Sequence, residues 1–405
     1  MPLAPETIRG FSLQRVPPGF IDDPYPFYAA LRERAPVHEL APGSLLLTRY
    51  DDVASIYRDP RVSSDKRREF APKFGSATPL FEHHTTSLVF NDPPLHTRVR
   101  RLMMGALSQR AIARMEAGVV ALVDALLDRM AGLDAPDLID DFASRIPVEV
   151  IGNLLDVPRA ERAPLRDWSL AILSALEPAP SADMLARGNA AVSAFLDALR
   201  GLVAARRSRP GDPEADVLTR LIEGERDGER LSETELLHNC IFLLNAGHET
   251  TSNLIGNGVH ALLAQRSQFE RLAAEPTLLP TAIEELLRYE SPLQLNNRLT
   301  TAPIELAGRA WPAGTFLTLG VAAANRDPAQ FADPDRLDIA RKPNLHVAFG
   351  HGGHACAGMN VARLEARIAI GRLVARFPKL DLDGAPGRDR RVRFRGFRRL
   401  PVRLG

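Results

Sequence analysis

One unusually long helical stretch constrains the fold of this chain more than any other feature. The segment "LSETELLHNCIFLL" places Ser232 three positions before Glu235, which is the spacing of a capping box at the start of a helix. The helical pattern then continues to about residue 264. At 1.5 Å per residue such a helix measures on the order of 45 Å, so we predict a central helix that crosses the whole molecule.

The middle of this helix is polar. An apolar run over Ile241–Leu244 meets the sequence "NAGHETTSN", where a core helix is expected to be buried. One interpretation is that the helix ends at Gly247 and restarts, because glycine and threonine weaken helices and threonine hydroxyls bond back to the preceding turn. The other is functional: Glu249 and Thr250 form an acid–alcohol pair at a local opening in the helix and relay protons into a dry site.

The remaining sequence predicts a mainly α protein with minor β structure. Helical signals dominate from Pro93 to about residue 300, and the strand-like segments "IELAG" and "TFLTLGV" follow. Residues 63–92 show no periodicity, so we expect a long irregular loop with a function there. Nearer the N-terminus we expect a short helix at Pro26–Arg34, a strand at Leu45–Thr48 and a helix starting near Asp51. With no internal repeat and no linker, residues 1–405 are expected to form a single domain.

Composition excludes several classes of protein. The formal net charge of +1 gives no global attraction to nucleic acid or to acidic membranes. The two cysteines, Cys240 and Cys356, are too few for a disulfide scaffold, which favours a reducing compartment. The N-terminus has no long apolar run and therefore resembles neither a signal peptide nor a membrane anchor. We expect a soluble cytoplasmic protein, with Cys240 an inert thiol in the core.

The sequence around Cys356 is a second constraint. In "HVAFGHGGHACAGMN" four glycines and three histidines crowd around this cysteine, and a helix-like stretch follows at once. Three interpretations of Cys356 are open: a structural thiol, a nucleophile served by His354 or His351, or a metal ligand. A single cysteine cannot build a zinc or iron–sulfur site, but it suffices as the axial ligand of haem. Backbone N–H groups of a glycine-rich loop can also stabilise the negative charge of a thiolate.

These residues carry a family resemblance. The stretch "FGHGGHACAG" followed by "ARLE" resembles the haem-binding signature of the cytochrome P450 superfamily. Four further motifs stand in the family's order: "HTRVR", "AGHETT", "EELLR" with Glu285 and Arg288, and "DPDRLDIAR" with Arg336. The resemblance implies a large helical body with small β-sheets, and haem between the long central helix and the helix after the cysteine loop. It also implies that Arg336 completes a structural ion-pair network with Glu285 and Arg288.

The resemblance assigns the remaining roles at the cofactor. Cys356 is expected to be the thiolate ligand of the iron of haem b (iron protoporphyrin IX), with Phe349 shielding the sulfur and Gly358 and Ala246 at haem-contacting positions. The haem carries two propionates, and buried carboxylates need cationic or hydrogen-bonding partners. The residues expected to bind them are His96, Arg100, Arg298 and His354.

A substrate pocket is expected beside this site. Asn245 either anchors a substrate oxygen or bonds to a neighbouring loop, and Arg395 either binds an acidic substrate or is structural. For His83 and His84 a solvated loop or a substrate contact is favoured over a metal site, which stays open as the third alternative. The lining residues expected are Phe242, Asn245, Leu293, Asn296 and, at a tip that closes the pocket, Phe397.

The function implied is that of a haem-thiolate monooxygenase, which hydroxylates or O-dealkylates a small or medium-sized organic substrate. Electrons from NAD(P)H would arrive through a ferredoxin reductase and a ferredoxin docked near Arg98, Arg101, Arg110 and Arg363. We expect a monomer with no nucleic-acid or membrane partner. The alternatives are a peroxide-driven peroxygenase, which would not need the Glu249–Thr250 pair, and, more remotely, a cysteine-dependent hydrolase.

Overall fold

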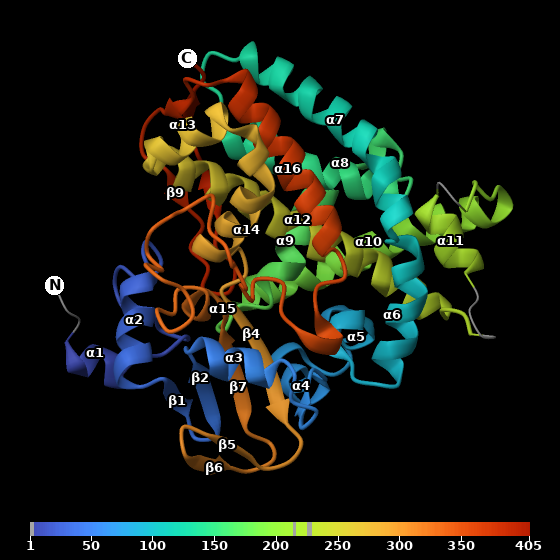
Figure 1. The fold of residues 1–405 in the computed structure, drawn as a ribbon. Coiled ribbons are helices and arrows are strands. Elements are labelled where there is room, and N and C mark those ends of the chain that lie inside the picture. The colour runs from blue at the N-terminus through green and yellow to red at the C-terminus, as the bar shows by residue number, and fades with distance from the viewer. Residues whose placement is uncertain (1–3, 214–215, 225–228) are drawn as a thin grey trace.

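A computed structural model describes residues 4–213, 216–224 and 229–405. Most of the molecule is a body of helices, and a smaller region with the main β-sheet lies at one end of it (Figure 1). The N-terminal helices α1 and α2 accompany this sheet, while α7, α8 and α16 lie in the body at the opposite end. The fold is therefore mainly α with small sheets, as the sequence predicts.

The central helix α12 spans Glu233–Ala264 without interruption. Its capping box is formed: Glu235 N–H donates to Ser232 Oγ at 3.2 Å, and Ser232 N–H donates to Glu235 Oε2 at 2.9 Å. The predicted long helix is confirmed, and the alternative of a helix that ends at Gly247 and restarts is excluded, because the polar side chains are accommodated inside the helix. Thr250 Oγ1 donates to the Ala246 carbonyl at 2.7 Å, and Ser252 Oγ donates to the His248 carbonyl at 2.9 Å.

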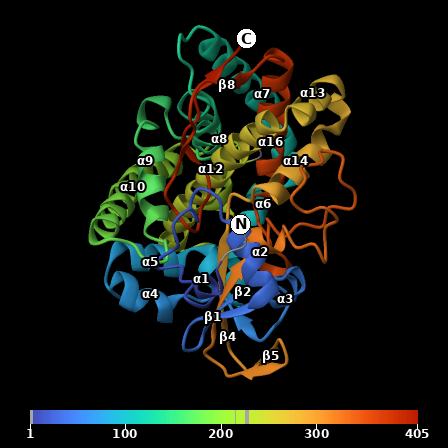
Figure 2. The ribbon, with the colours of Figure 1, turned by 90° about the vertical axis from the view of Figure 1, so that its left-hand side faces the viewer.

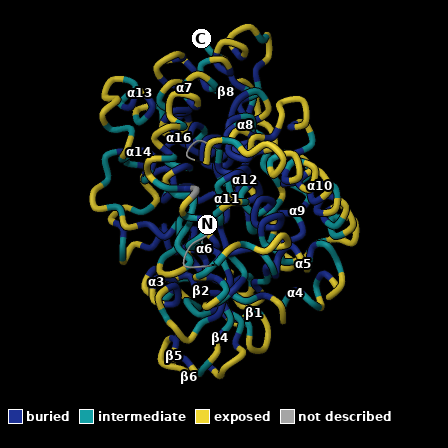
Figure 3. Tube along the Cα trace, turned by 90° about the vertical axis from the view of Figure 1, so that its right-hand side faces the viewer, coloured by how far each residue is buried: buried dark blue, intermediate teal, exposed yellow. Residues whose placement is uncertain are grey.

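Other helices surround α12 and bury it. Helices α8, α9, α10, α14 and α16 all pack against it, and the tube in Figure 3 shows α12 dark and enclosed by partly exposed neighbours. The α-helices in the described residues are α1 (Pro5–Arg9), α2 (Tyr25–Arg34), α3 (Tyr50–Ile56), α4 (Arg67–Phe74), α5 (Pro79–Thr86), α6 (Leu95–Ala106), α7 (Gln109–Ala131), α8 (Arg145–Leu154), α9 (Leu165–Ser174), α10 (Ala182–Ser208), α11 (Val217–Glu223), α12, α13 (Arg266–Ala274), α14 (Leu279–Tyr289), α15 (Val321–Ala324) and α16 (Met359–Arg376).

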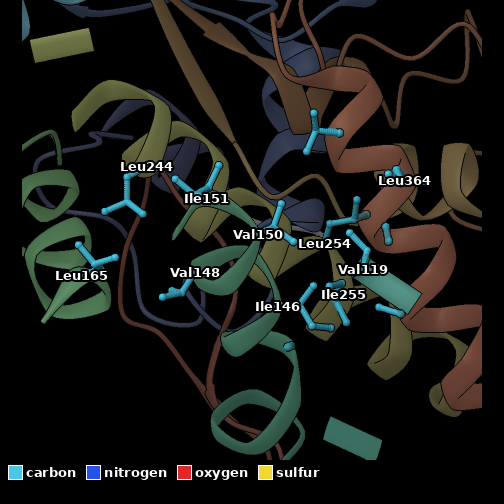
Figure 4. Close-up of a cluster of buried hydrophobic side chains, with 14 of the residues drawn as sticks. Val119, Ile146, Val148, Val150, Ile151, Leu165, Leu244, Leu254, Ile255 and Leu364 are labelled. Atoms are coloured by element: carbon cyan, nitrogen blue, oxygen red, sulfur yellow. The ribbon is translucent and has the colours of Figure 1, made fainter. Parts of the chain in front are cut away.

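Apolar side chains fill the space between these helices. Figure 4 shows one part of this core, where Ile146 and Val150 of α8 lie close to Leu254 and Ile255 of α12. All four side chains are at most 2% exposed. Among the described residues, no helix is both long enough and apolar enough to cross a membrane.

The main sheet combines early and late parts of the chain. Its strand order is β1–β2–β7–β4–β3, and Figure 2 shows these strands below the helical body. Strands β2 and β7 run parallel, with Leu45 opposite Leu317, and β7 pairs antiparallel with β4. The strands are β1 (Val37–Ala41), β2 (Ser44–Leu47), β3 (Val62–Ser63), β4 (Leu295–Thr300), β5 (Ile304–Leu306), β6 (Arg309–Trp311), β7 (Phe316–Gly320), β8 (Asp381–Leu382), β9 (Gly387–Arg388), β10 (Phe397–Arg399) and β11 (Val402–Arg403).

The expected loop over residues 63–92 is wrong, because this segment holds two short helices and a 3₁₀ turn. Helix α5 has a proper start: Thr78 Oγ1 accepts from Phe81 N–H at 3.3 Å, and Pro79 is the first helical residue. Each helix is only eight residues long, which is too short for a clear apolar period. Aromatic packing supplies the order instead, with Phe70 and Phe74 lying 5.5 and 5.4 Å from the ring of His84.

Candidate active site

The loop that carries Cys356 has a tightly determined backbone. The Cys356 N–H donates to the Phe349 carbonyl at 2.9 Å, which closes the loop just before α16. Gly352 has a φ of +70°, and a Cβ at this position would meet the Tyr57 carbonyl oxygen at 2.6 Å. Only glycine fits there, both for its conformation and for the close backbone contact. The glycines of this loop therefore set the path of the chain around the sulfur.

The two cysteines lie in different environments. Cys240 is completely buried in α12, and burial raises the pKa of its thiol to about 12, as expected for an inert core thiol. Burial also raises the pKa of Cys356, but there a hydrogen bond from the backbone of Gly358 and the charges of Arg100 and Arg363 oppose it. Groups that favour a thiolate therefore converge on Cys356 alone.

The four residues expected to bind the propionates come together beside this loop. The rings of His96 and His354 have centroids 3.8 Å apart, and Arg100 Nη2 donates to the Ala355 carbonyl at 2.8 Å. Arg298 comes from β4, and its guanidinium lies 5.2 Å from the Tyr57 ring centroid. Three segments that are far apart in the sequence thus deliver four cationic or cation-forming groups to one place.

This cluster lacks a compensating charge. Within the described parts of the chain, neither Arg100 nor Arg298 has a carboxylate within 4 Å, and the buried Nε2 of His96 has no hydrogen-bond partner. Burial, together with the positive charges of His96, Arg298 and Arg100, lowers the pKa of His354 to about 3. Burial also lowers the pKa of Arg298. A ligand with two carboxylates would supply the missing charge, so the donor set fits the haem propionates.

The middle of α12 leaves space for such a group. From Leu236 to Leu263, a stretch described in full, Ala246 is the one exposed residue, whereas Asn245 and Glu249 are buried. Thr250 lies one turn beyond Ala246 and is partly buried. The small side chain of Ala246 therefore leaves one turn of this interior helix exposed. The same turn carries the predicted acid–alcohol pair, Glu249 and Thr250.

Glu249 has a partner that the sequence did not indicate. Its carboxylate forms an ion pair with Arg391 from the C-terminal segment, and both side chains are less than 10% exposed. Arg391 Nε also donates to Asp389 Oδ2 at 2.8 Å. Arg391 therefore holds the acid of the predicted relay from outside α12. Glu249 and Arg391 lie far apart in the sequence, which explains why no local pattern reveals this ion pair.

The ion-pair network around Glu285 requires one correction. Arg288 donates to both oxygens of Glu285 at 2.8 Å, as expected, but the second arginine is Arg341, whose Nε lies 3.1 Å from each oxygen. Arg336 points outward, with a side chain 66% exposed and an ion pair to Asp338. Only the Arg336 carbonyl joins the network, by accepting from Arg288 Nη2 at 3.3 Å. The chain turns between these residues, and the turn decides which guanidinium points inward.

A second ion-pair group lies beside the cysteine loop and was missed by the sequence analysis. Arg363 of α16 donates to both oxygens of Glu284 at 2.7 and 2.8 Å, and His346 Nε2 lies 3.1 Å from Oε2. Burial opposes ionisation of Glu284, but these partners outweigh it and lower its pKa to about 2. The Arg363 guanidinium also lies 4.7 Å from the ring centroid of Phe349. This group fixes both flanks of the loop.

The arginines expected to form a docking patch are mostly paired. Arg98 and Arg101 lie on α6 and Arg363 on α16, and each forms an ion pair with a glutamate. Arg110 is exposed at the start of α7. This face therefore carries less uncompensated positive charge than the sequence alone suggests. The partners of the first three are Glu235, Glu229 and Glu284, respectively.

Two polar residues of the expected pocket have partners inside the protein. Asn245 Nδ2 lies 3.4 Å from His83 Nε2 of α5, while Asn245 Oδ1 is buried without a hydrogen-bond partner among the described residues. Asn296 Nδ2 donates to the Tyr57 hydroxyl at 3.2 Å, beside Arg298. Asn245 thus bonds to a neighbouring segment and keeps one free acceptor. Phe242, one turn before Ala246, is partly buried.

His83 and His84 are not solvated. Both are at most 3% exposed, and burial lowers the pKa of His84 to about 3. In the described part of the chain, no group of three or more histidine, cysteine or acidic side chains is arranged to hold a metal ion. These two histidines therefore belong to the interior of the α4–α5 region.

Phe397 is not where a pocket residue is expected. Its ring packs on His260 with centroids 4.7 Å apart, and His260 lies about 21 Å along α12 from Ala246 at 1.5 Å per residue. The C-terminal segment runs along the helix, and an earlier residue, Phe394, forms the bridge with Leu293. Phe397 therefore lies far from Ala246, contrary to the prediction, and Phe394 is the phenylalanine of this segment that lies beside Leu293.

Arg395 is structural. Its Nε forms an ion pair with Glu290, and its two other nitrogens donate to the Ile21 and Asp22 carbonyls at 2.7 and 2.9 Å. The side chain is 8% exposed. Each of the three guanidinium nitrogens therefore has a partner inside the protein, which favours the structural role over the binding of an acidic substrate.

The fold and the cysteine loop together define the class of haem-thiolate enzymes. The family model for cytochrome P450 matches residues 178–391. Cytochrome P450 107B1 of Saccharopolyspora erythraea is 41% identical over 404 residues, covering 95% of this chain and 96% of the relative. The vitamin D(3) 25-hydroxylase of Pseudonocardia autotrophica is 41% identical over 398 residues, covering 95% of each. The chain belongs to the cytochrome P450 family, and it is a P450 monooxygenase, an oxidoreductase.

Solved structures agree with this assignment. A crystal structure of P450BioI in complex with hexadec-9Z-enoic acid ligated acyl carrier protein superposes with a TM-score of 0.90 at 34% identity. The superposition covers 95% of this chain and 100% of that one. The family implies a haem cofactor, redox partners and an organic substrate, and the residues around Cys356 fit that cofactor.

Proposed function

We propose that this protein hydroxylates or O-dealkylates a small or medium-sized organic substrate at a haem b held by Cys356. The observation that carries the proposal is the cluster of His96, Arg100, Arg298 and His354, which lacks a counter-charge and lies beside the only cysteine with groups favouring a thiolate. When bound, haem supplies the redox chemistry that activates oxygen, and a cysteine ligand favours O–O cleavage. Phe349, Gly358 and Ala246 are the residues expected to border it.

The protein's own part in the reaction is to orient the substrate and to move protons. Thr250 Oγ1 donates to the Ala246 carbonyl, so its oxygen is held at the exposed turn of α12 and can accept and pass a proton. Glu249 is the acid behind it, held by Arg391. The proposed substrate pocket is lined by Phe242, Asn245, Leu293 and Asn296, with Phe394 in the place expected for Phe397.

The electron supply completes the proposal. Electrons from NAD(P)H reach the site through a ferredoxin reductase and a ferredoxin, since the family needs redox partners. Residues 1–405 form one monomeric domain that works in the cytoplasm, without nucleic-acid or membrane partners. The hydroxylase name of one relative, which is 41% identical, supports hydroxylation as the reaction type.

One experiment tests the assignment. The purified protein is expected to contain one haem, and its reduced carbon monoxide complex is expected to show the absorption band that gives the family its name. Cys356→Ala should abolish this band, whereas Cys240→Ala should keep it. Turnover is expected only with ferredoxin, its reductase and NAD(P)H. Equal rates with hydrogen peroxide alone would favour the peroxygenase, and a colourless active protein would revive the cysteine-dependent hydrolase.

A further inference from the structure

A second group of buried and partly buried charges lies where four segments of the proposed substrate region meet. These segments are the start of α4, the chain just after α9, the first residues of β4 and the C-terminal stretch at residues 391–394. The group consists of Lys66, Lys73, Glu69, Glu177 and Arg393. The haem-binding residues and the proton relay described above do not use these side chains.

Arg393 joins three of the four segments. Its Nε donates to the Leu176 carbonyl at 2.9 Å, its Nη1 donates to the Leu295 carbonyl at 3.3 Å, and its Nη2 donates to Asn297 Oδ1 at 2.6 Å. All three acceptors are neutral. Burial lowers the pKa of this guanidinium. Its positive charge is therefore held in place by hydrogen bonds but is not neutralised by them.

Lys66 is the least satisfied member of the group. Its side chain is 4% exposed, and Nζ lies 3.2 Å from Glu69 Oε2. An ammonium group carries three donors, and no other acceptor in the described residues is within reach of this one. The nitrogen also lies 5.0 Å from the ring centroid of Phe316. Burial lowers the pKa of Lys66 to about 8, with Glu69 opposing the shift.

Lys73 and Glu177 complete the group. Lys73 Nζ donates to the backbone carbonyl of Glu177 at 2.8 Å, so its charge also lacks a close carboxylate. Glu177 Oε2 accepts the backbone N–H groups of Val392 and Arg393 at 2.8 and 3.1 Å, whereas its Oε1 has no partner. Burial and the charge of Arg393 lower the pKa of Lys73 to about 8.

The charges in this group do not balance. Lys66, Lys73 and Arg393 contribute three positive charges and Glu69 and Glu177 two negative ones, so 3 − 2 leaves one positive charge in excess within this group; Arg298, whose charge also lowers the pKa of Lys66, is counted with the haem propionates. Uncompensated buried charge is costly. Lysine is also rare here: the chain has 51 lysines and arginines, and only Lys66, Lys73, Lys342 and Lys379 are lysines. Half of the lysines therefore lie in this one group.

We propose that Lys66, supported by Arg393, binds the carboxylate of a monocarboxylic acid substrate whose apolar part extends toward the haem. One excess positive charge matches a monoanion better than a doubly charged phosphate. Lys66 offers free ammonium donors, and the Phe316 ring, whose centroid lies 5.0 Å from Nζ, provides apolar surface close by. This inference deepens the proposed function, on which it rests, because the acid must occupy the same substrate region.

The test compares carboxylic acids with their neutral counterparts. Dodecanoic acid and 4-phenylbutanoic acid, each beside its primary amide, are titrated against the ferric protein, with calorimetry and the haem absorption recorded in parallel. The acids are expected to bind about 10-fold or more tightly than the amides, which is the order expected for a hydrogen bond between charged groups. Lys66→Met should remove this preference and leave the amide affinities within about 3-fold, whereas Lys66→Arg should retain it.

Lys379→Met is the matched control, because Lys379 is exposed and belongs to none of the four segments; it should leave the preference unchanged. The preference should also weaken as the pH rises above about 8, where Lys66 loses its charge: burial and the positive charges of Arg298 and Arg393 lower its pKa, and Glu69 raises it. Equal affinities for acid and amide in the wild-type protein would overturn the inference, even if Lys66→Met fails to fold. The proposed function fails separately, if no haem is present; calorimetry would then still report the acid preference.

Discussion

The two arginines near Glu285 give a decisive prediction, because the sequence motif and the structure assign different residues to one role. Arg341→Ala removes a guanidinium from a completely buried carboxylate, and Arg336→Ala removes an exposed one. We expect the first variant to lose stability and haem, and the second to resemble the wild-type protein. The same substitution at two positions of one segment makes each variant the control for the other.

The expected magnitude follows from the contacts. Without Arg341, Glu285 keeps the two hydrogen bonds of Arg288, the Asp338 N–H at 2.9 Å and the Asn344 amide at 3.1 Å. The full cost of breaking a buried ion pair, about 3–5 kcal/mol, is therefore reduced. A value of about 1.5–3 kcal/mol, typical of a lost hydrogen bond to a charged group, is the better expectation. Arg336→Ala removes an exposed pair, worth about 0–1 kcal/mol.

The loss should reach the cysteine loop. Arg341 also donates to the Ala332 carbonyl at 2.7 Å and the Arg336 carbonyl at 3.1 Å, so it shapes the segment that leads to residue 346. Urea unfolding followed by far-ultraviolet circular dichroism and by haem absorbance gives the two midpoints, and the carbon monoxide complex gives the active fraction. Equal midpoints in the two variants, or a larger loss in Arg336→Ala, would refute the assignment of Arg341.

Three further predictions concern the site itself. Thr250→Ala should bind substrate normally and oxidise NAD(P)H but release hydrogen peroxide, because the hydroxyl that passes a proton is missing. Product and peroxide are measured per NAD(P)H oxidised, with Thr251→Ala as the milder control. Tight coupling of NAD(P)H oxidation to product in Thr250→Ala would show that Thr250 is dispensable. Arg298→Ala should weaken haem retention by about 1.5–3 kcal/mol, measured by haem transfer to an acceptor protein, and unchanged retention would contradict its role at the propionates. Gly352→Ala should disrupt the cysteine loop, since its Cβ would meet the Tyr57 carbonyl at 2.6 Å, whereas Gly353→Ala meets no atom within 4 Å and should be neutral; equal haem content in both would show that the loop tolerates the change.

Features that depend on neighbouring residues could be predicted from the sequence. The capping box at Ser232 and Glu235 formed as expected, because both partners lie within one turn. Glu285 and Arg288 are three residues apart on a helix, so their bond also follows from local geometry. The glycine-rich loop around Cys356 and the order of the family motifs were enough to place the chain among the cytochromes P450.

The tertiary structure decided which side chains meet across long distances in the chain. Arg341 rather than Arg336 reaches Glu285, and Arg391 reaches Glu249, because irregular segments turn in ways that no periodic pattern records. Phe394 rather than Phe397 lies beside Leu293 for the same reason. The excess charge around Lys66 and Arg393 is also invisible in a chain whose net charge is only +1. Folding brings these separate charges together and withdraws them in part from water, which no count along the sequence can record.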